Sequence, residues 1–487
     1  MQKLGKQNVS KEEKSTVIKE ILDKLKNVKI PEFESYLKVS IYENEDNQLE
    51  ITSHQPLIYT PGVLAKFLFS NLNKIIIYND SDKAEFKFLS KELNFEKPFE
   101  KLTKEEIENL IKFINHSWDY YKDFIKINKN GIQKTKENVE IFLDTLKNEK
   151  IDKFAYFWNQ ILVKYLEKWG INTNFQIKTL SEICQDKNLE LPFKDYFYLI
   201  IDNYDDYYYL YNEAVDIFRK SLGFYPVKKL NPGETGFWII KDKKRNNLLY
   251  LNGKIVIENT KETIENISNY EIRPKAVNWS LYRRYFIYKN HKDILGIGSS
   301  YYNFVCDYIA INLFNFLPPS TISVSLSLSL EDNQTLENEL NEITNLKSLL
   351  NSFKSSIFKN PEKLSKILSH LQKYEKYIDT NYLSENVKKI EILLDKNLLK
   401  QKLTLIEQIN NKEYRHLKKE LTQKLIEINN QLLIPIKPFL EDLQKSMELS
   451  ELQIERLYKE YKSLNSRDYP YFLISPLKIL EKLEDEK

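Results

Sequence analysis

The chain has 487 residues, of which 42% are hydrophobic and 13% aromatic, so it can form several domains with real cores and is not globally disordered. Its 73 basic and 70 acidic residues leave a net charge of +3, which does not favour a general nucleic-acid or membrane surface. The two cysteines, Cys184 and Cys306, argue against a disulfide framework and a cysteine-based zinc site. No leader-like N-terminal segment or membrane-length apolar run is seen, so we expect a cytoplasmic protein.

The first strongly patterned segment is a strand, a polar loop and a helix between residues 51 and 67. Thr60 suits a helix N-cap and Pro61 the first helical position. His54 and Gln55 therefore lie just before a helix N-terminus, where unpaired N–H groups and the helix dipole favour an anion. The segment has two interpretations: a ligand-binding loop, or a tight turn in which both side chains satisfy backbone groups.

A short apolar strand follows over residues 74–78 and ends in the polar run Asn79-Asp80-Ser81-Asp82. Strand, helix and strand within so short a stretch form a βαβ unit, which implies a parallel sheet. Both polar loops then lie at the carboxyl ends of neighbouring strands, the edge at which open α/β sheets bind ligands. Asp80 and Asp82 are candidates to hold Mg²⁺, or to bind a ribose or an amine of the substrate.

Residues 103–222 are expected to be mainly helical, and the tyrosine-rich run at 207–211 indicates packing rather than a platform for stacking bases. Residues 237–258 predict a β-hairpin. The chain then has a second candidate site at residues 273–317. Two adjacent arginines there can clamp a phosphate or carboxylate, and a glycine- and serine-rich turn that opens an apolar helix resembles a phosphate nest. These residues are Arg283, Arg284, Gly296, Gly298, Ser299 and Ser300. The alternative for the glycines is a helix start that needs close backbone packing.

After Pro318-Pro319, residues 331–465 predict long helices with leucines at coiled-coil spacing. We interpret them as an antiparallel helical arm that forms a homodimer, because its leucines need a partner to bury them. The expected organisation is a first half of a Rossmann-like α/β core at 1–102, a helical connector at 103–222, a second half at 223–330, the arm at 331–465 and a return to the core at 466–487.

Several motifs resemble those of an uncharacterised bacterial family that begins His-Gln-Pro…Pro-Gly-Val. They are His54-Gln55-Pro56, Pro61-Gly62-Val63, Asp80-Ser81-Asp82, Glu234-Thr235-Gly236-Phe237-Trp238, Pro274-Lys275-Ala276 and the run from Leu295 to Asp307. The resemblance marks Glu234, Tyr302 and Asp307 as further substrate-binding residues. This chain departs from the family pattern at Leu295, Ser299, Tyr301 and Asn303, where the family has His, Gly, Lys and Asp.

The same layout is similar, more distantly, to the cysteine-adding enzyme family of bacillithiol biosynthesis. That similarity implies a Rossmann-like core resembling class I nucleotidyltransferases, a connector insertion and a dimerising C-terminal coiled coil. It implies a ligase, or a nucleotidyl- or amino-group transferase, acting on a small phosphorylated or sugar-type substrate with ATP or ADP and Mg²⁺. His54 is then expected to donate a hydrogen bond to a phosphate or leaving-group oxygen, and Gln55 to orient the substrate. The alternative is a non-catalytic binding or assembly protein that kept the fold and the arm.

Overall fold

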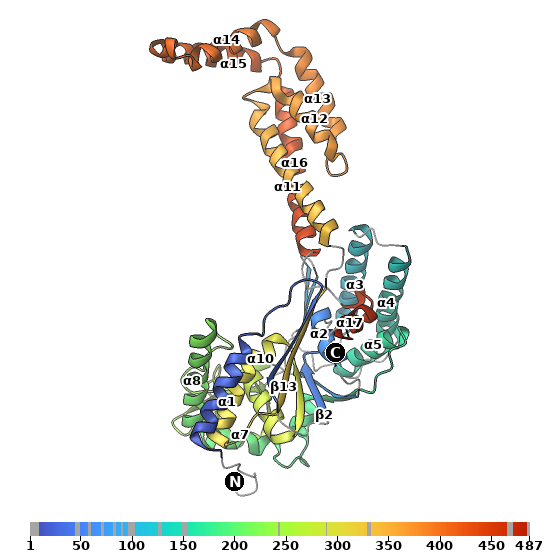
Figure 1. The fold of residues 1–487 in the computed structure, drawn as a ribbon, viewed down its shortest axis with the longest axis vertical. Helices are drawn as coiled ribbons and strands as arrows, with labels where there is room; N and C mark the ends of the chain where they lie inside the picture. The colour runs from blue at the N-terminus through green and yellow to red at the C-terminus, as the bar shows by residue number, and fades with distance from the viewer. Residues whose placement is uncertain are drawn as a thin grey trace. The chain divides into compact units, whose positions relative to one another are not determined.

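The computed structural model describes residues 9–43, 49–56, 60–69, 73–80, 84–88, 91–95, 103–124, 129–148, 154–241, 244–288, 290–328, 333–464 and 471–484. The chain divides into two compact units (Figure 1). The first unit comprises Met1–Leu330 with Arg467–Lys487, and the second comprises Glu331–Ser466. Within the described residues, no helix combines the length and hydrophobicity that a membrane span requires.

The first unit is a mixed α/β structure built on a six-stranded sheet with the order β1-β13-β12-β2-β3-β6. Its strands are β1 (Ser35–Tyr42), β2 (Leu49–His54), β3 (Ile75–Tyr78), β6 (Gln176–Thr179), β12 (His291–Leu295) and β13 (Ser320–Ser327). The edge strand β1 runs antiparallel to β13, and every other neighbouring pair is parallel. The predicted parallel sheet is therefore confirmed, with one antiparallel edge.

The order of the parallel strands reverses between β2 and β12. Numbered by their sequence along the chain, the five parallel strands have the order 3-2-1-4-5, which is the doubly wound Rossmann-like arrangement. β2 and β12 are paired neighbours, with Thr52 opposite Ile294. The loops that follow these two strands therefore leave the same edge of the sheet in opposite directions. Such a switch point is the usual ligand position in open α/β sheets.

Strand β3 shows why the sheet is buried on both faces. Ile75 and Ile77 belong to one hydrophobic core, whereas Ile76 and Tyr78 belong to the other. Successive side chains of a strand point to opposite faces, so four consecutive apolar residues serve two cores at once. The apolar run that predicted a buried parallel strand is confirmed.

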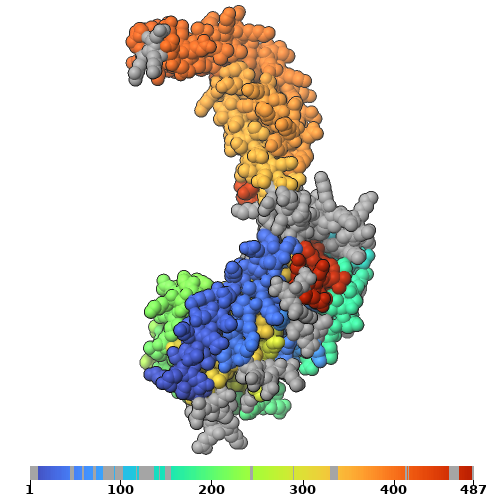
Figure 2. Space-filling view, in the orientation of Figure 1, coloured from blue at the N-terminus to red at the C-terminus, as the bar shows by residue number. Residues whose placement is uncertain are grey.

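Helices cover each face of this sheet. One face carries α2 (Pro61–Leu68), α3 (Lys104–Phe124), α4 (Lys129–Asn148), α5 (Phe154–Lys168) and α17 (Pro476–Glu484). The other carries α1 (Lys11–Leu25), α7 (Phe193–Asp202), α8 (Tyr204–Leu222), α9 (Ala276–Tyr282) and α10 (Ile297–Ile309) (Figure 1). The C-terminal helix α17 packs against α2 and β1, so residues from both ends of the chain complete the first unit (Figure 2).

A second, antiparallel sheet has the order β10-β9-β8-β7-β11. It consists of β7 (Glu234–Lys241), β8 (Lys244–Leu251), β9 (Lys254–Ile257), β10 (Thr263–Ile264) and β11 (Glu271–Pro274). The hairpin predicted at 237–258 is confirmed by the pairing of β7, β8 and β9. A separate two-stranded sheet pairs β4 (Ala84–Phe88) with β5 (Lys91–Phe95), and the short helix α6 (Leu180–Gln185) follows β6 directly.

Several strands lie where the sequence analysis placed none, and β6 and β13 are two of them. β6 falls inside the range expected to be mainly helical, and its sequence Gln-Ile-Lys-Thr is short and polar because it forms a sheet edge. β13 follows the Pro318-Pro319 break, and its serines alternate with apolar residues. The range 103–222 therefore supplies one sheet edge and helices to both faces, rather than an independent helical body.

The second unit is helical throughout its described residues. Its helices are α11 (Asn333–Ile357), α12 (Leu364–Leu371), α13 (Thr380–Leu393), α14 (Lys396–Asn410), α15 (Lys418–Leu433) and α16 (Lys437–Leu464). Lys347 pairs with Glu455 at 2.5 Å and Lys354 with Glu451 at 2.7 Å, so α11 and α16 are antiparallel. Leu346 and other leucines of the predicted stripe are buried in a core of this unit shared by α11, α12, α13 and α16. These leucines therefore do not need a second chain to bury them.

Candidate functional site

A cavity of about 650 Å³ lies in the first unit, where the switch point is. Its wall is built by the loop after β2, the start of α2, the loop after β12, the start of α10 and strand β13. The polar and glycine residues that line it are Ser53, His54, Gln55, Thr60, Gly62, Lys66, Asn79, Gly296, Gly298, Ser299, Tyr302, Ser325 and Ser327. The structure thus brings together two of the predicted candidate sites, the loop that carries His54 and Gln55 and the glycine turn that carries Gly296 and Gly298.

The start of α2 has the predicted cap. The Oγ of Thr60 accepts a hydrogen bond from the Val63 N–H at 3.4 Å, and Pro61 occupies the first turn. Gly62 lies against β13, because a Cβ at this position would be 2.7 Å from the carbonyl oxygen of Leu326. The glycine therefore lets the N-terminus of α2 approach strand β13 closely.

The glycines at the start of α10 have a different setting. Gly296 is the N-cap, with φ −86° and ψ 170°, values open to any residue. A Cβ on Gly296 or Gly298 would meet no protein atom within 4 Å. Neither close packing nor backbone strain therefore requires these glycines, and the interpretation as a close-packed helix start does not fit. What remains is a helix start whose first-turn residues, including Gly298 and Ser299, line the cavity.

Ser299 and Tyr302 extend the site along the first turn of α10. Both line the cavity, and the Tyr302 hydroxyl lies 3.2 Å from the Ser299 Oγ. Ser300 does not line the cavity; it is buried, and its Oγ donates to the Gly296 carbonyl at 3.0 Å. Of the two serines predicted to bind a phosphate, the structure places one in the site and uses the other within the helix.

His54 ends β2 and reaches the cavity as a neutral ring. Burial lowers its pKa, and the nearby positive charge of Lys66 lowers it further. Its Nδ1 lies 3.1 Å from the Gln55 carbonyl oxygen. Because a carbonyl oxygen only accepts, Nδ1 carries the hydrogen and Nε2 carries the lone pair. The neutral ring therefore has an acceptor at Nε2, and its one N–H is used by the Gln55 carbonyl rather than by a ligand. The sequence analysis expected His54 to donate to a phosphate oxygen, and this tautomer does not fit that role.

Lys66 is a cavity residue that the sequence analysis did not identify. Its side chain is 2% exposed, and its Nζ donates to the Ser53 carbonyl oxygen at 2.7 Å. Burial lowers the pKa of this amine to about 7. The spacing of four residues from Gly62 places both on one face of α2, and this relation was available from the sequence.

The charge of the cavity is one-sided. None of the described residues that line it is acidic, whereas Lys66 and His54 contribute basic groups. Two helix N-termini, those of α2 and α10, add the positive ends of their dipoles. This combination favours an anionic ligand and disfavours a bare cation.

Arg283 and Arg284 lie outside this cavity. Both are nearly fully buried, and Arg283 binds Asp293 through two hydrogen bonds of 2.8 and 2.7 Å. Arg284 bridges Asp293 at 2.5 Å and Asp307 at 2.8 Å. Burial by itself would raise the pKa of Asp293, but the two guanidinium groups outweigh it and lower that pKa. The predicted bidentate geometry is present, with internal carboxylates as the partners rather than a ligand.

Asp307 belongs to this buried network, where it also accepts a hydrogen bond from the Tyr285 hydroxyl at 2.5 Å. It does not line the cavity, although Tyr302 of the same helix does. Burial raises the pKa of Asp307, and Arg284 opposes that effect. We therefore assign Asp307 a role in holding α10 and the π-helical turn η2 (Arg283–Ile287) together, rather than in binding substrate.

The remaining predicted acidic residues are also outside the cavity. Asp80 accepts hydrogen bonds from the Ser181 N–H at 2.9 Å and the Ser181 hydroxyl, and so binds the start of α6. Glu234 pairs with Lys275 and accepts from the Asn231 N–H at 3.1 Å. Asp82 lies outside the described residues. Among the residues that the structure describes, no group of three His, Cys, Asp or Glu side chains is placed to hold a metal ion.

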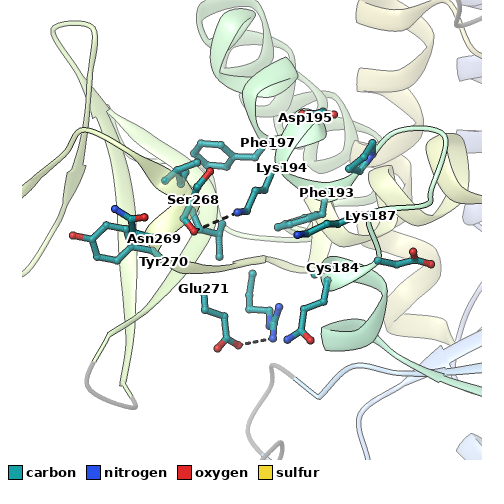
Figure 3. Close-up of a pocket in the computed structure, with 16 residues that line it drawn as sticks. Cys184, Lys187, Phe193, Lys194, Asp195, Phe197, Ser268, Asn269, Tyr270 and Glu271 are labelled. Carbon is teal, nitrogen blue, oxygen red and sulfur yellow. Dashed lines mark hydrogen bonds and ion pairs between the residues drawn. The ribbon is translucent and has the colours of Figure 1, made fainter.

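A second cavity of about 600 Å³ lies between α6, α7 and β11 (Figure 3). Its charges are balanced, with the basic residues Lys187, Lys194 and Arg273 set against the acidic residues Asp186, Asp195 and Glu271. Arg273 pairs with Glu271. Burial raises the pKa of Cys184 to about 12, so this thiol stays protonated at neutral pH. The switch-point cavity is therefore the better candidate for an anionic ligand.

No protein-family model matches the chain, and no curated protein sequence matches it. The assignment of a function therefore depends on the geometry and charge of the switch-point cavity.

Proposed function

We propose that the switch-point cavity binds a small phosphorylated molecule, with ATP or ADP as the ligand class. One observation carries the proposal: the N-termini of α2 and α10 open on one cavity that has no acidic residue among its described lining. Its volume, about 650 Å³, is within the usual range for small-molecule sites. Phosphate oxygens accept hydrogen bonds from first-turn amides, and the helix dipoles favour their charge.

We further propose that the protein is a ligase, or a nucleotidyl- or amino-group transferase, acting on a small phosphorylated or sugar-type substrate. In this chemistry the amides of Gly298 and Ser299 hold the phosphates, and Gln55 orients the acceptor. His54 accepts the proton of the attacking amine or hydroxyl at Nε2 and later returns it to solvent or to the leaving group. The hydrogen bond at Nδ1, which leaves the lone pair on Nε2, supports that role.

Mg²⁺ is the expected companion of nucleotide phosphates, and Asp80 and Asp82 were its predicted ligands. Asp80 does not fit, because both of its carboxylate oxygens are engaged by Ser181. Asp82 lies outside the described residues. We therefore propose that backbone amides and basic side chains of the cavity bind the phosphates, without a metal ion at Asp80.

The resemblance to the bacillithiol cysteine-adding family supports the class of reaction. The strand order 3-2-1-4-5 is compatible with the class I nucleotidyltransferase-like core that this resemblance implies. Three of the four departures from the nearer family pattern lie outside the cavity: Leu295, Tyr301 and Asn303. The Tyr301 hydroxyl instead donates to the Val28 carbonyl. These departures therefore do not remove a lining residue from the proposed site.

The alternative function is a non-catalytic protein that binds the same ligand or assembles with itself. The placement of Arg283 and Arg284 in a buried network favours it, because the site then lacks the arginines expected to stabilise a transferring phosphoryl group. We also propose a homodimer formed through the second unit as a coiled-coil arm. Its support is the exposure of apolar residues on the paired helices α14 and α15, such as Leu403 and Ile426.

The first experiment is a thermal-shift screen of the full chain with ATP, ADP and adenosine. The proposal predicts that ATP and ADP raise the melting temperature and adenosine does not, because a ligand stabilises the folded state in proportion to its affinity. ATP consumption by wild type and by His54→Ala then separates the two functions. If His54 is a catalytic base, His54→Ala should lower turnover by roughly two powers of ten and keep its affinity for ADP. A binding protein shows no turnover in either chain.

A further inference from the structure

Lys66 differs from the other buried lysines of the described chain. Three lysines are buried: Lys66, Lys74 and Lys402. Lys74 lies 3.6 Å from Glu50, and Lys402 lies 3.2 Å from Glu362. No acidic side chain among the described residues forms an ion pair with Lys66, whose Nζ donates instead to the Ser53 carbonyl. Buried charges are normally paired, so the missing partner needs an explanation.

The position of Lys66 supplies that explanation. It lines the switch-point cavity together with His54 and Ser53, on the same face of α2 as Gly62. An ammonium group has three N–H donors, and the Ser53 carbonyl engages one of them. The remaining donors have no acidic partner among the described residues, and the cavity that they border lacks acidic residues there too. The complementary group is therefore an anion brought by a ligand.

The groups that act on Lys66 come from three other elements. Asp293 of β12 attracts its charge, Arg283 of η2 repels it, and His54 of β2 is the neighbouring titratable ring. Asp293 cannot serve as a partner, because its oxygens are engaged by the two arginines. β13 and α17 also pack on α2, and they contribute apolar residues to the shared core, including Val324 and Ile479.

We propose that Lys66 is the group that binds the ligand's terminal phosphate, and that it takes up one proton from solvent when the ligand binds. This inference rests on the proposed function and adds the residue that pairs with the ligand's negative charge. In the free protein, burial lowers the pKa of this amine to about 7, so it is largely neutral above that pH. A bound phosphate stabilises the ammonium form and raises the pKa of Lys66 in the complex.

The affinity for the ligand should depend on pH because Lys66 titrates. Below about pH 7 Lys66 is already charged, so ligand binding takes up no proton there. Above that pH, binding requires protonation of the amine, and affinity falls as pH rises. The loss approaches about tenfold per pH unit until the pH reaches the pKa of Lys66 in the complex. A phosphate monoester is fully ionised in the same window, because its second pKa is about 6.

The test is calorimetric titration of the full chain with ADP from about pH 7.5 to about pH 9.5, where its phosphates do not titrate. Each titration is repeated in two buffers of different ionisation enthalpy, which gives the number of protons taken up. Lys66→Arg keeps a positive charge that does not titrate in this window, and Lys66→Met removes the amine. Lys74→Met is the matched control, because burial lowers the pKa of Lys74 to about 8, inside the same window.

We expect wild type and Lys74→Met to take up about one proton and to lose affinity about tenfold per pH unit. Lys66→Arg should bind ADP with little pH dependence, and Lys66→Met should bind at least about tenfold more weakly without proton uptake. ADP binding by wild type with no proton uptake across the window overturns the role of Lys66 and leaves the proposed function standing. Failure of wild type to bind ADP at any pH overturns both. The wild-type measurement decides the question even where a variant fails to fold.

Discussion

Asp293 accepts hydrogen bonds from both terminal nitrogens of Arg283, at 2.8 and 2.7 Å, and belongs to β12, the strand whose end opens on the cavity. Arg284 shares the same carboxylate. Removal of that carboxylate leaves two buried guanidinium groups without their main partner. We expect Asp293→Ala to lower the free energy of unfolding by about 3–5 kcal/mol.

Urea denaturation followed by tryptophan fluorescence measures this loss. All five tryptophans lie between residues 118 and 279, so the signal reports the first unit. Glu262→Ala is the matched control, because its ion pair with Lys241 is about one-third exposed and should contribute far less to stability than the buried network. Equal losses for the two variants would contradict the buried network.

His291 should make the stability of the first unit depend on pH. The ring is fully buried, and burial lowers its pKa to about 3. The unfolded chain binds a proton near pH 6.5 and the folded chain does not, so stability is complete above about pH 6.5 and falls as the pH drops towards 3. The slope from this one group is about 1.4 kcal/mol per pH unit.

His291→Gln keeps a donor for the Tyr288 carbonyl, which lies 3.0 Å from Nδ1, and removes the titration. Urea denaturation at about pH 6 and about pH 5 should therefore show a smaller difference for the variant than for wild type. His370→Gln, at an exposed position of α12, should keep the wild-type difference. An identical pH dependence in all three chains would mean that His291 is not buried in its neutral form.

The two glycine settings predict opposite results for the same substitution. Gly298→Ala places a methyl group in open space within a helix, so it should stabilise the fold by about 0.4–1 kcal/mol. If phosphate lies on these amides, the methyl group should still weaken ADP binding. Gly62→Ala meets the Leu326 carbonyl at 2.7 Å and should destabilise the fold by about 1–3 kcal/mol. Unchanged ADP affinity in Gly298→Ala would contradict ligand binding at this turn.

The second unit is proposed to form a dimer through α14 and α15. Leu403 is 50% exposed and Ile426 is 48% exposed, one on each helix. Lysine at both positions should convert the dimer to a monomer in multi-angle light scattering, because charged side chains are poorly tolerated in a buried interface. Leu449→Lys, on α16 and 69% exposed, is the control and should remain dimeric. A wild-type chain with monomer mass would contradict this interface.

The sequence predicted the parts of the fold that have a strong local signal. The apolar run of β3 and the Thr60-Pro61 helix start are both present. β6 and β13 were missed because one is short and polar at a sheet edge and the other carries serine at alternate positions. Without them the strand order, and therefore the switch point, was not available from the sequence.

The cavity itself was predicted in part, since His54, Gln55, Gly296, Gly298, Ser299 and Tyr302 line it together. Arg283, Arg284 and Asp307 were expected there, but long-range pairing decides the partner of a buried charge, and the sequence holds no signal for it. Lys66 was missed because nothing in the sequence distinguishes it from the other lysines. One lysine among 65 is unremarkable until the tertiary structure buries it without an acidic partner.

A crystal structure of the full chain with ADP tests the central claim most directly. We predict that the terminal phosphate lies within about 2.7–3.2 Å of an amide of Gly298 or Ser299 and of the Lys66 Nζ. The same complex shows whether Nε2 of His54 faces the space in which the attacking amine or hydroxyl of the second substrate would bind. ADP bound instead in the cavity lined by Cys184 and Arg273, or bound elsewhere on the chain, would contradict the assignment of the switch-point cavity as the phosphate site.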